Sequence, residues 1–414
     1  MRLTLQFTYT STNVARLSQD RLIGPKSPKL DREIRGVSFN STVICKGEAE
    51  APEDITVNYY GPHTLPDGAP EHRISAYITS YSAPTAITMG GFFGFLWNQL
   101  AFKPKLVAAS KRLESKTILI TGANIGLGFA TARELATHKP SRLILGVRDA
   151  KKGEAAKESI LKTSPEVEVV VLTLDYNSYD SLIAFAKQVA SVGTLDYVLL
   201  NAGIKMMEYQ LSDGGHETNV QINHLGTSLL SLLLLPTLQA SAKVTGRPSR
   251  LTIVTSEGHF WVPFHERTAP NILARMDEKE TFGVAMQRYY TSKLLNILWT
   301  RELASKINSE EVIINTVNPG FCYSGLHRHE KTGVIKIVLW LFGWTSEQGG
   351  HCLADALVEH DDSHGQYLSL QKTMDPSNFI ISDDGEIAQK QIWKETIALL
   401  KKEVPEADIS SFDN

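Results

Sequence analysis

The sequence predicts one α/β domain in which helices cover both faces of a doubly wound parallel β-sheet, giving three layers. Two observations lead to this fold class. Between about residue 113 and residue 320, short runs of β-branched and apolar residues alternate with longer segments of helical character. A glycine-rich turn also joins the first of these runs to the first helical segment. Strands and helices that alternate at this spacing build parallel sheets, and ligands bind at the carboxyl ends of the strands.

The first strand and helix carry the glycine-rich turn between them. Residues 116–120 (KTILI) form a predicted buried strand, residues 121–128 (TGANIGLG) the turn, and residues 129–136 the helix. Glycine permits the tight turn and lets a pyrophosphate approach the backbone closely. The start of the helix adds unpaired N–H groups and the positive end of the helix dipole. This unit therefore predicts a dinucleotide site.

The later units repeat the pattern of strand followed by helix. Strands are predicted at residues 142–148, 167–174, 195–200, 250–254 and 312–317. Helices are predicted at residues 150–161, 181–192 and 224–238, and a further helix begins at Thr345 or Ser346. The leucine cluster at 229–235 is too short for a membrane span, so we expect it in the core or in a subunit interface.

Composition and charge limit the classes of function. The chain has 414 residues, a formal net charge of -3 and three cysteines, Cys45, Cys322 and Cys352. This charge gives no reason to expect a nucleic-acid partner. The cysteines have neither metal-ligand spacing nor the number that a disulfide framework needs. The sequence shows no run of about eighteen apolar residues and no secretory signal. We therefore expect an intracellular, cytoplasmic protein without a metal site.

The N-terminal residues differ in character from the rest. Residues 1–88 are rich in Ser, Thr, Pro and Asp with little periodicity, so they form either a disordered extension or an artefact of a natural start at Met89. Residues 89–112 are an aromatic, amphipathic lead-in. It either lies on a membrane surface as an interfacial helix, or its aromatic side chains dock on the domain's own surface or line its substrate mouth. The catalytic domain is then expected at residues 113–404, with a tail at 405–414.

Polar residues follow three predicted strands on the side where a dinucleotide would lie. Arg148 ends the second strand, Asp175 ends the third, and Asn201 begins an Asn-Ala-Gly sequence after the fourth. An acidic residue after the second strand would bind the ribose 2′-hydroxyl of NAD. Arg148 instead offers a guanidinium suited to the 2′-phosphate of NADP, unless it is an ordinary surface arginine. We therefore predict NADP as the cofactor.

A Tyr–Lys pair supplies the predicted chemistry. Residues 289–293 are Tyr-Tyr-Thr-Ser-Lys, and helix residues that are three or four positions apart share a face. A lysine ammonium beside a tyrosine hydroxyl lowers the pKa of the phenol from about 10 toward neutrality, where it exchanges protons. This geometry does not choose between Tyr289 and Tyr290 as the partner of Lys293.

Taken together, these features resemble the short-chain dehydrogenase/reductase family over about residues 113–400. The matching motifs are Thr-Gly-x-x-x-Gly-x-Gly at 121–128, Asn-Ala-Gly at 201–203, Asn223, Ser256, Tyr-x-x-x-Lys at 289–293 and Pro-Gly at 319–320. The family pattern selects Tyr289 as the partner of Lys293. The His-Leu-Gly after Asn223 and the position of Arg148 are most similar to the retinol-dehydrogenase-like branch. The aromatic lead-in and the C-terminal region resemble fungal members linked to secondary metabolism.

The resemblance implies a Rossmann-like fold, NADP-dependent oxidoreductase activity and a role for each matched residue. Tyr289 would donate a proton to the developing alkoxide, and Ser256 would orient the substrate oxygen. Lys293 would lower the tyrosine pKa and bind the nicotinamide ribose, while Asn223 would hold a water that links Lys293 to solvent. The implied cofactor contacts are Gly122, Asn124, Ile125, Gly126, Gly128, Arg148, Asp175, Asn201, Tyr289, Lys293, Pro319 and Ser324.

The segment after the Pro-Gly turn is expected to set substrate specificity. Residues 325–346 are apolar and aromatic, which predicts a lid over a lipophilic small-molecule substrate. A helix packed on the core and a membrane contact are the alternatives for this segment. A homo-oligomer and peripheral membrane association are both compatible with the sequence. For the whole chain, the alternatives to an enzyme are a protein that senses NADPH without turnover and a membrane-surface scaffold.

Overall fold

The chain divides into two compact units, Met1–Ile87 and Thr88–Asn414. The computed structural model describes residues 6–8, 40–42, 92–323, 325–327, 341–407 and 409–412. In the first unit, β1 (Gln6–Thr8) pairs antiparallel with β2 (Asn40–Thr42), with Gln6 opposite Thr42. The rest of the predicted N-terminal extension lies outside the described residues and stays a prediction.

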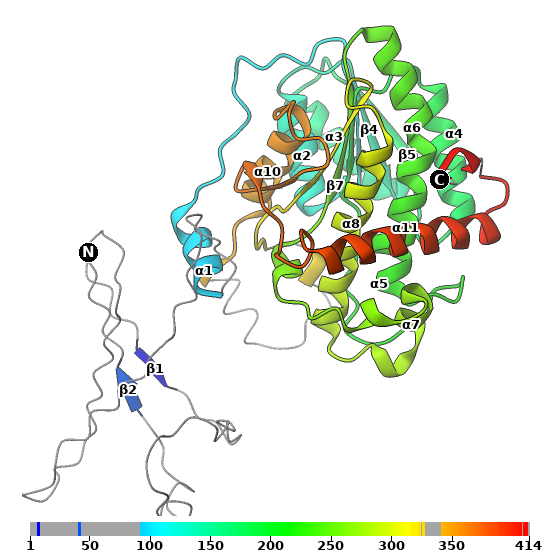
Figure 1. Ribbon diagram of the computed structural model, residues 1–414. Helices are drawn as coiled ribbons and strands as arrows, with labels where there is room; N and C mark the ends of the chain where they lie inside the picture. Colours follow the sequence, from blue (N-terminus) through cyan, green and yellow to red (C-terminus); the bar gives the residue numbers. More distant parts are fainter. Residues whose placement is uncertain are drawn as a thin grey trace, which may run out of the picture. The chain divides into compact units, whose positions relative to one another are not determined.

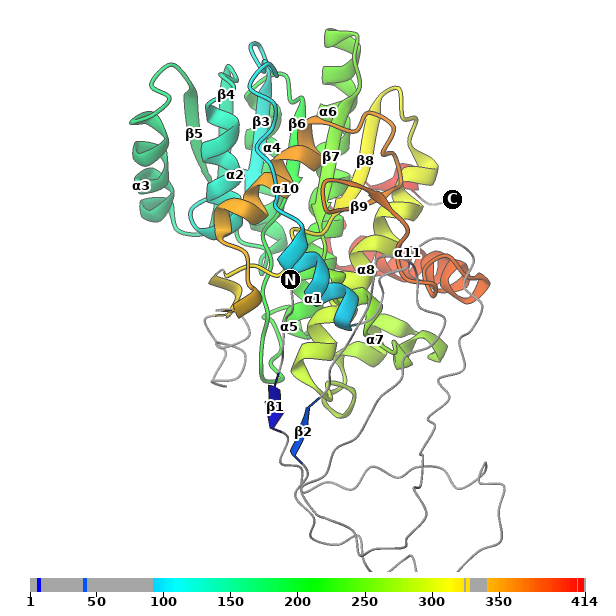
Figure 2. The same cartoon turned by 90° about the vertical axis from the view of Figure 1, so that its left-hand side faces the viewer.

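The second unit is built on an eight-stranded sheet with the order β10-β9-β8-β7-β6-β3-β4-β5, and Figure 2 shows the strands from β5 to β9 side by side. Their bounds are β3 (Thr117–Thr121), β4 (Arg142–Val147), β5 (Glu168–Thr173), β6 (Tyr197–Leu200), β7 (Ser249–Val254), β8 (Val312–Val317), β9 (Tyr367–Ser369) and β10 (Lys372–Met374). Neighbouring strands are parallel from β5 to β9, and β10 runs antiparallel to β9 at the edge. The strand order reverses between β3 and β6, which is where such sheets bind their ligands.

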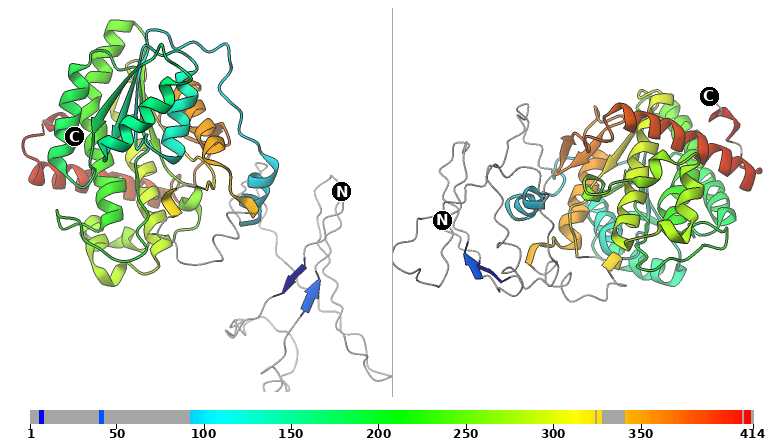
Figure 3. Two further views of the ribbon diagram at one scale, coloured as in Figure 1. Left: turned by 180° about the vertical axis from the view of Figure 1, so that it is seen from behind. Right: turned by 60° about the horizontal axis from the view of Figure 1, so that its bottom comes forward.

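Helices cover both faces of this sheet (Figures 1 and 3). The α-helices are α1 (Phe92–Ala101), α2 (Gly126–Ala136), α3 (Ala150–Leu161), α4 (Tyr179–Ser191), α5 (Thr218–Val220), α6 (Gly226–Thr245), α7 (Ile272–Asp277), α8 (Ala285–Lys306), α10 (Ser346–Val358) and α11 (Asp383–Glu403). Short π and 3-10 turns are η3 (Gln221–Leu225), η4 (Glu257–Phe260), η5 (His265–Thr268), η6 (Lys279–Thr281), η7 (Gly325–His327) and η8 (Ser410–Phe412). One face packs against α2, α3 and α10, and the other against α4, α6 and α8. The predicted α/β fold class is therefore confirmed.

The central strand shows how the sequence fills both layers. Ile118 and Ile120 on β3 belong to the core under α2 and α10, whereas Leu119 belongs to the core on the opposite face. Successive strand residues point to opposite faces, so a strand covered on both sides must be apolar throughout. All five residues of β3 are buried.

The leucine-rich helix lies in the core, as one of the two expectations had it. Leu229, Leu230 and Leu234 of α6 are fully buried. The continuous helical run Thr218–Thr245 is long and apolar enough to cross a membrane, but 72% of its apolar window is buried inside the protein. That environment is the one a core helix occupies.

Candidate active site

The glycine-rich turn links β3 to α2 at the switch point of the sheet. Gly122 and Gly126 both have left-handed backbone angles, with φ of 67° and 61°. Side chains other than glycine rarely adopt this conformation, so the two glycines fix the path of the turn. The turn leads into α2, whose first residue is Gly126.

The start of α2 is open. Ile125 occupies the N-cap position in extended conformation and, in the described part of the chain, no side chain accepts a hydrogen bond from the first turn. By contrast, α3, α4 and α11 are capped by Asp149, Ser178 and Ser382. Unpaired N–H groups together with the helix dipole make an anion site, so the open start of α2 fits a diphosphate.

Asn201 ties the end of β6 to the glycine turn. Its Nδ2 donates to the Thr121 carbonyl at 2.9 Å, and its backbone N–H donates to Thr121 Oγ1 at 3.0 Å. Tyr176 O–H donates to the same Thr121 hydroxyl at 3.1 Å. Gly128 is packed into this junction, because a Cβ there would lie 2.6 Å from both Asn201 Nδ2 and Gly122 O. Gly128 therefore serves the contact between helix and strand rather than the cofactor surface.

Two cationic side chains line the cavity that the residues of the glycine-rich turn also line. Arg148 follows β4, Lys152 lies in the first turn of α3, and both line the cavity together with Asp149 and Asp175. Asp149 caps α3 by accepting from the Lys152 N–H at 3.2 Å, and its carboxylate also pairs with Lys152 Nζ at 3.5 Å. The hydrogen bond from the Lys152 amide lowers the pKa of Asp149.

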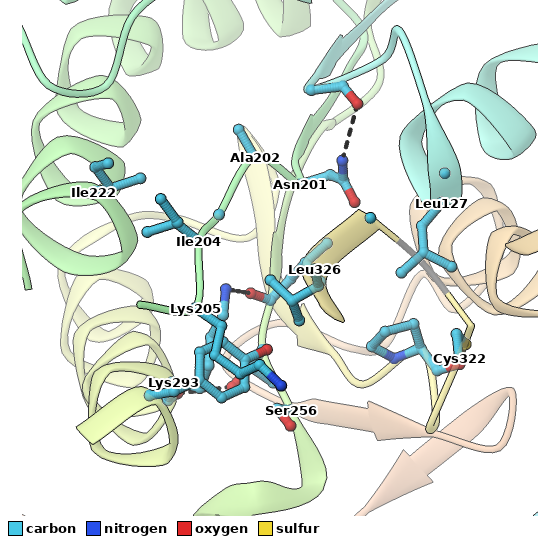
Figure 4. Close-up of a pocket in the computed structure, with 18 of the residues that line it drawn as sticks. Leu127, Asn201, Ala202, Ile204, Lys205, Ile222, Ser256, Lys293, Cys322 and Leu326 are labelled. Atoms are coloured by element: carbon cyan, nitrogen blue, oxygen red, sulfur yellow. Dashed lines mark hydrogen bonds between the residues drawn. The ribbon is translucent and has the colours of Figure 1, made fainter. Parts of the chain in front are cut away.

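The predicted catalytic side chains come together where β7 meets α8. Ser256 follows β7, and Tyr289 and Lys293 lie one turn apart on α8; all three line the cavity. Thr255 Oγ1 donates to the Lys293 carbonyl at 2.7 Å and so joins β7 to α8. Figure 4 shows Ser256 and Lys293 close together, with Asn201 and Leu127 on the opposite side of the cavity.

Burial moves the pKa values of the Tyr–Lys pair apart. It raises the pKa of Tyr289 well above its usual value, with the charge on Tyr290 acting in the same direction and a hydrogen bond with Ser256 opposing it. Burial lowers the pKa of Lys293 to about 8. The lowered tyrosine pKa expected from the sequence is therefore not a property of this structure.

Asn223 is fully buried behind the cavity, in the π turn η3. Its Oδ1 accepts from Ile204 N at 2.8 Å, and its Nδ2 donates to Ile204 O at 2.8 Å and to Ser292 Oγ at 2.9 Å. Ser292 Oγ in turn donates to the Tyr289 carbonyl at 2.7 Å. Asn223 thus links the backbone after β6 to the helix that carries the tyrosine. Single π turns often occur at functional sites.

Gly203, the last residue of the Asn-Ala-Gly sequence, makes room for polar catalytic groups. A Cβ at this position would lie 3.0 Å from Asn223 Oδ1 and 3.2 Å from Lys293 Nζ. Lys293 Nζ itself donates to the Val254 carbonyl at 3.0 Å. The close approach explains why this motif ends in glycine.

These groups surround one cavity of about 790 Å³. Of the described residues expected to contact the cofactor, all but Gly128 line it. Ser324 lies outside the described residues. The predicted lid is described only at its ends, η7 and residues 341–346, so it also stays a prediction. The chain just before η7 is joined to the second of these ends, because Tyr323 N donates to Trp344 O and Trp344 N donates to Phe321 O, both at 2.8 Å.

Several cavity residues were not predicted. Lys205 is 1% exposed and follows the Asn-Ala-Gly sequence by two positions, so the motif itself points to it. Glu257 directly follows Ser256, and burial raises its pKa to about 7 against a hydrogen bond with Asn318. Phe95 comes from α1, which agrees with the expectation that the lead-in packs beside the substrate. Cys322 follows the Pro-Gly turn by two positions.

Comparison with known proteins identifies this arrangement. A family model described as short chain dehydrogenase matches residues 116–256. The short chain dehydrogenase sol3 of Alternaria solani is 54% identical over 283 residues, which cover 68% of this chain and 99% of that protein. The chain belongs to the short-chain dehydrogenase family. It is accordingly an oxidoreductase that acts on alcohol or carbonyl groups.

Other similar proteins agree with this short-chain dehydrogenase assignment. The short-chain dehydrogenase/reductase phmF of Phaeosphaeria nodorum is 35% identical over 306 residues, covering 72% of this chain and 90% of that protein. A crystal structure of an uncharacterised protein from Mycobacterium paratuberculosis superimposes with a TM-score of 0.55 at 25% identity, covering 72% of this chain and 98% of that one. The family predicted from the motifs is therefore confirmed.

Proposed function

We propose that this short-chain dehydrogenase uses NADP to transfer hydride to or from a carbonyl or alcohol group of a lipophilic small molecule in secondary metabolism. The observation that carries the proposal is the shape of the cavity. It runs from the open start of α2 and Arg148 at one end to Ser256, Tyr289 and Lys293 at the other. Fungal relatives such as sol3 and phmF support the metabolic setting.

The cofactor preference rests on charge at the far end of the cavity. Arg148 and Lys152 would hold the 2′-phosphate of NADP, and the N–H groups at the start of α2 would hold its diphosphate. Asp149 is occupied with capping α3 and pairing Lys152, which leaves its carboxylate poorly placed to accept from a ribose hydroxyl. When bound, the cofactor supplies or accepts the hydride.

The protein groups at the other end handle the proton. Because burial raises the pKa of Tyr289, its hydroxyl is protonated at neutral pH and can donate to a developing alkoxide. Ser256 Oγ accepts from the Gly258 N–H at 3.1 Å, so its own O–H proton can point to the substrate oxygen.

The experiment compares two neighbouring tyrosines. Purified wild type, Tyr289→Phe and Tyr290→Phe are assayed for NADPH oxidation with a panel of lipophilic aldehydes and ketones. Loss of the general acid in Tyr289→Phe is expected to lower kcat by about a thousandfold while NADPH affinity stays within about twofold. Tyr290→Phe should retain turnover within about tenfold. Wild-type turnover by Tyr289→Phe would refute the assignment, as would loss of turnover confined to Tyr290→Phe.

A further inference from the structure

Helix α1 is fastened to the loop after β8 by a single buried amide. Gln99 is 5% exposed. Its Nε2 donates to Phe321 O at 2.9 Å and to Phe342 O at 3.1 Å, and its Oε1 accepts from Phe321 N at 3.2 Å. The side-chain amide thus makes hydrogen bonds to two backbone segments, which are 21 residues apart in the chain (342 minus 321). One side chain from before the sheet fixes two points of the loop that follows Pro319.

The backbone of α1 strengthens the same contact. Gln99 O accepts from Trp344 Nε1 at 2.8 Å, and Trp344 is 4% exposed. The Phe102 ring lies 5.9 Å from the Trp344 ring. Because Trp344 N also donates to Phe321 O, α1, Phe321 and Trp344 form one hydrogen-bonded unit. Figure 1 shows α1 beside the segment that leads into α10.

Phe95 lies one helical turn before Gln99, so both side chains share the inner face of α1. Phe95 is 6% exposed and lines the cavity. Its ring meets Trp261 edge to face at 5.2 Å and Phe321 at 5.7 Å. Trp261 in turn contacts Tyr290, the neighbour of the catalytic tyrosine, at 5.9 Å. We call Phe95, Trp261, Tyr290 and Phe321 the aromatic wall.

We propose that α1 is a specificity element of this enzyme. Phe95 completes an aromatic wall that favours planar aromatic or conjugated carbonyl compounds, and Gln99 is the positioning residue that holds Phe321 in that wall. All four rings line the cavity, and an aromatic ligand beside them would gain attraction beyond the apolar area that it buries. The inference rests on the proposed function, since it concerns the substrate of the same site.

The opposite side of α1 offers a matched control. Trp97 is 65% exposed and does not line the cavity among the residues described for it. Trp97→Ala removes an aromatic side chain from the same helix without touching the wall. It should leave every kinetic constant unchanged within error.

The test compares naphthaldehyde with its fully hydrogenated analogue, which has the same skeleton without the flat ring system. Phe95→Ala and the bulkier Phe95→Leu are assayed with NADPH. Both are expected to raise the KM for naphthaldehyde by about five- to tenfold and to change the KM for the saturated aldehyde by less than about twofold. The kcat values and the NADPH affinity should stay near those of wild type. An equal change for both aldehydes, or no change, would overturn the inference.

Gln99→Leu tests the positioning role. It removes three hydrogen bonds at nearly constant volume, so Phe321 keeps the hydrogen bond from Trp344 N but loses both of those to Gln99, while Phe95 remains. We expect the same loss of selectivity as in Phe95→Leu, again in KM and not in kcat, together with faster hydrogen exchange at the Phe321 amide. Faster exchange with unchanged selectivity would show that Gln99 only stabilises the loop, which refutes the positioning role.

A binding measurement separates this inference from the proposed function. The alcohols that correspond to the two aldehydes are titrated into NADP-loaded wild type and Phe95→Leu by equilibrium dialysis, which needs no turnover. Selective weakening of naphthylmethanol supports the aromatic wall even if NADPH oxidation is never seen, in which case the proposed function fails alone. If wild type binds neither alcohol, or prefers the saturated one, the aromatic wall does not select planar ligands and the inference is wrong.

Discussion

The cofactor half and the substrate half of the cavity are assembled in different ways. Gly126, Arg148 and Asn201 each lie within five residues of the end of a strand, and neighbouring strands of one sheet bring them together. On the substrate side, Phe95 and Phe321 contact each other although one precedes β3 and the other follows β8. The first half is therefore specified by local motifs, whereas the second depends on long-range packing.

The difference extends to how backbone groups are satisfied. The start of α2 faces the cofactor half without a side-chain cap, as far as the described residues show. The adjacent helix α10 begins with a complete capping box, in which Thr345 and Gln348 exchange hydrogen bonds. The two helices pack closely, and Thr131 Oγ1 donates to Gly350 O at 3.3 Å. The N-terminus of α2 thus leaves its N–H groups available to a ligand, whereas side chains cap the N-terminus of α10.

Closing the start of α2 should have the largest effect. In Ile125→Asp, the new carboxylate accepts from the first-turn N–H groups, which should stabilise the free protein by about 1 kcal/mol. The same charge repels the diphosphate, so the Kd for NADPH should rise by about a hundredfold. Thermal unfolding and NADPH fluorescence titration measure the two effects, with Ile125→Leu as the control. Unchanged NADPH affinity in Ile125→Asp would mean that the diphosphate lies elsewhere.

Arg148 tests the far end of the cofactor half, with a smaller expected effect. In Arg148→Gln the loss of a charged hydrogen-bond donor should weaken NADPH by about tenfold, and NADH, which lacks the phosphate, by less than about twofold. Lys151→Gln removes a nearby exposed charge that is not among the described cavity residues. It should alter neither affinity. If Arg148→Gln weakens both cofactors equally, Arg148 does not discriminate the 2′-phosphate.

Local sequence signals predicted much of the cofactor half. The predicted bounds of α3 and β8 agree with the structure, since Asp149 caps α3 and all six residues of β8 are buried. The glycine turn follows from backbone conformation alone. Gly128 was placed in the right motif, but its close packing against Asn201 could not be predicted, because Asn201 lies 73 positions later in the chain (201 minus 128).

What the sequence did not predict depends on tertiary packing. Helix α11 has a mixed sequence, and it is held by contacts such as Trp393 stacked on Trp299 at 4.6 Å. Helical stability in proteins comes mainly from such packing, so no local sequence pattern predicts α11. The pKa of Tyr289 was predicted from its spacing to Lys293, but burial, which the spacing does not encode, raises it and lowers that of Lys293.

The pH dependence of KM should distinguish two titratable groups of the substrate half, Glu257 and Lys293, with the smallest effect of the series. Burial raises the pKa of Glu257, on the substrate side, to about 7. Glu257 is therefore neutral below about pH 6 and becomes a carboxylate beside apolar substrate above about pH 8. An ionised group disfavours apolar contact, so the KM for naphthaldehyde should rise by about threefold across this range. Glu257→Gln should abolish the rise.

The dependence of kcat around pH 8, where the buried Lys293 loses its proton, should persist in that variant. A KM rise that survives Glu257→Gln would assign the titration to another group, whereas loss of both dependences would show that Glu257 and Lys293 titrate as one unit.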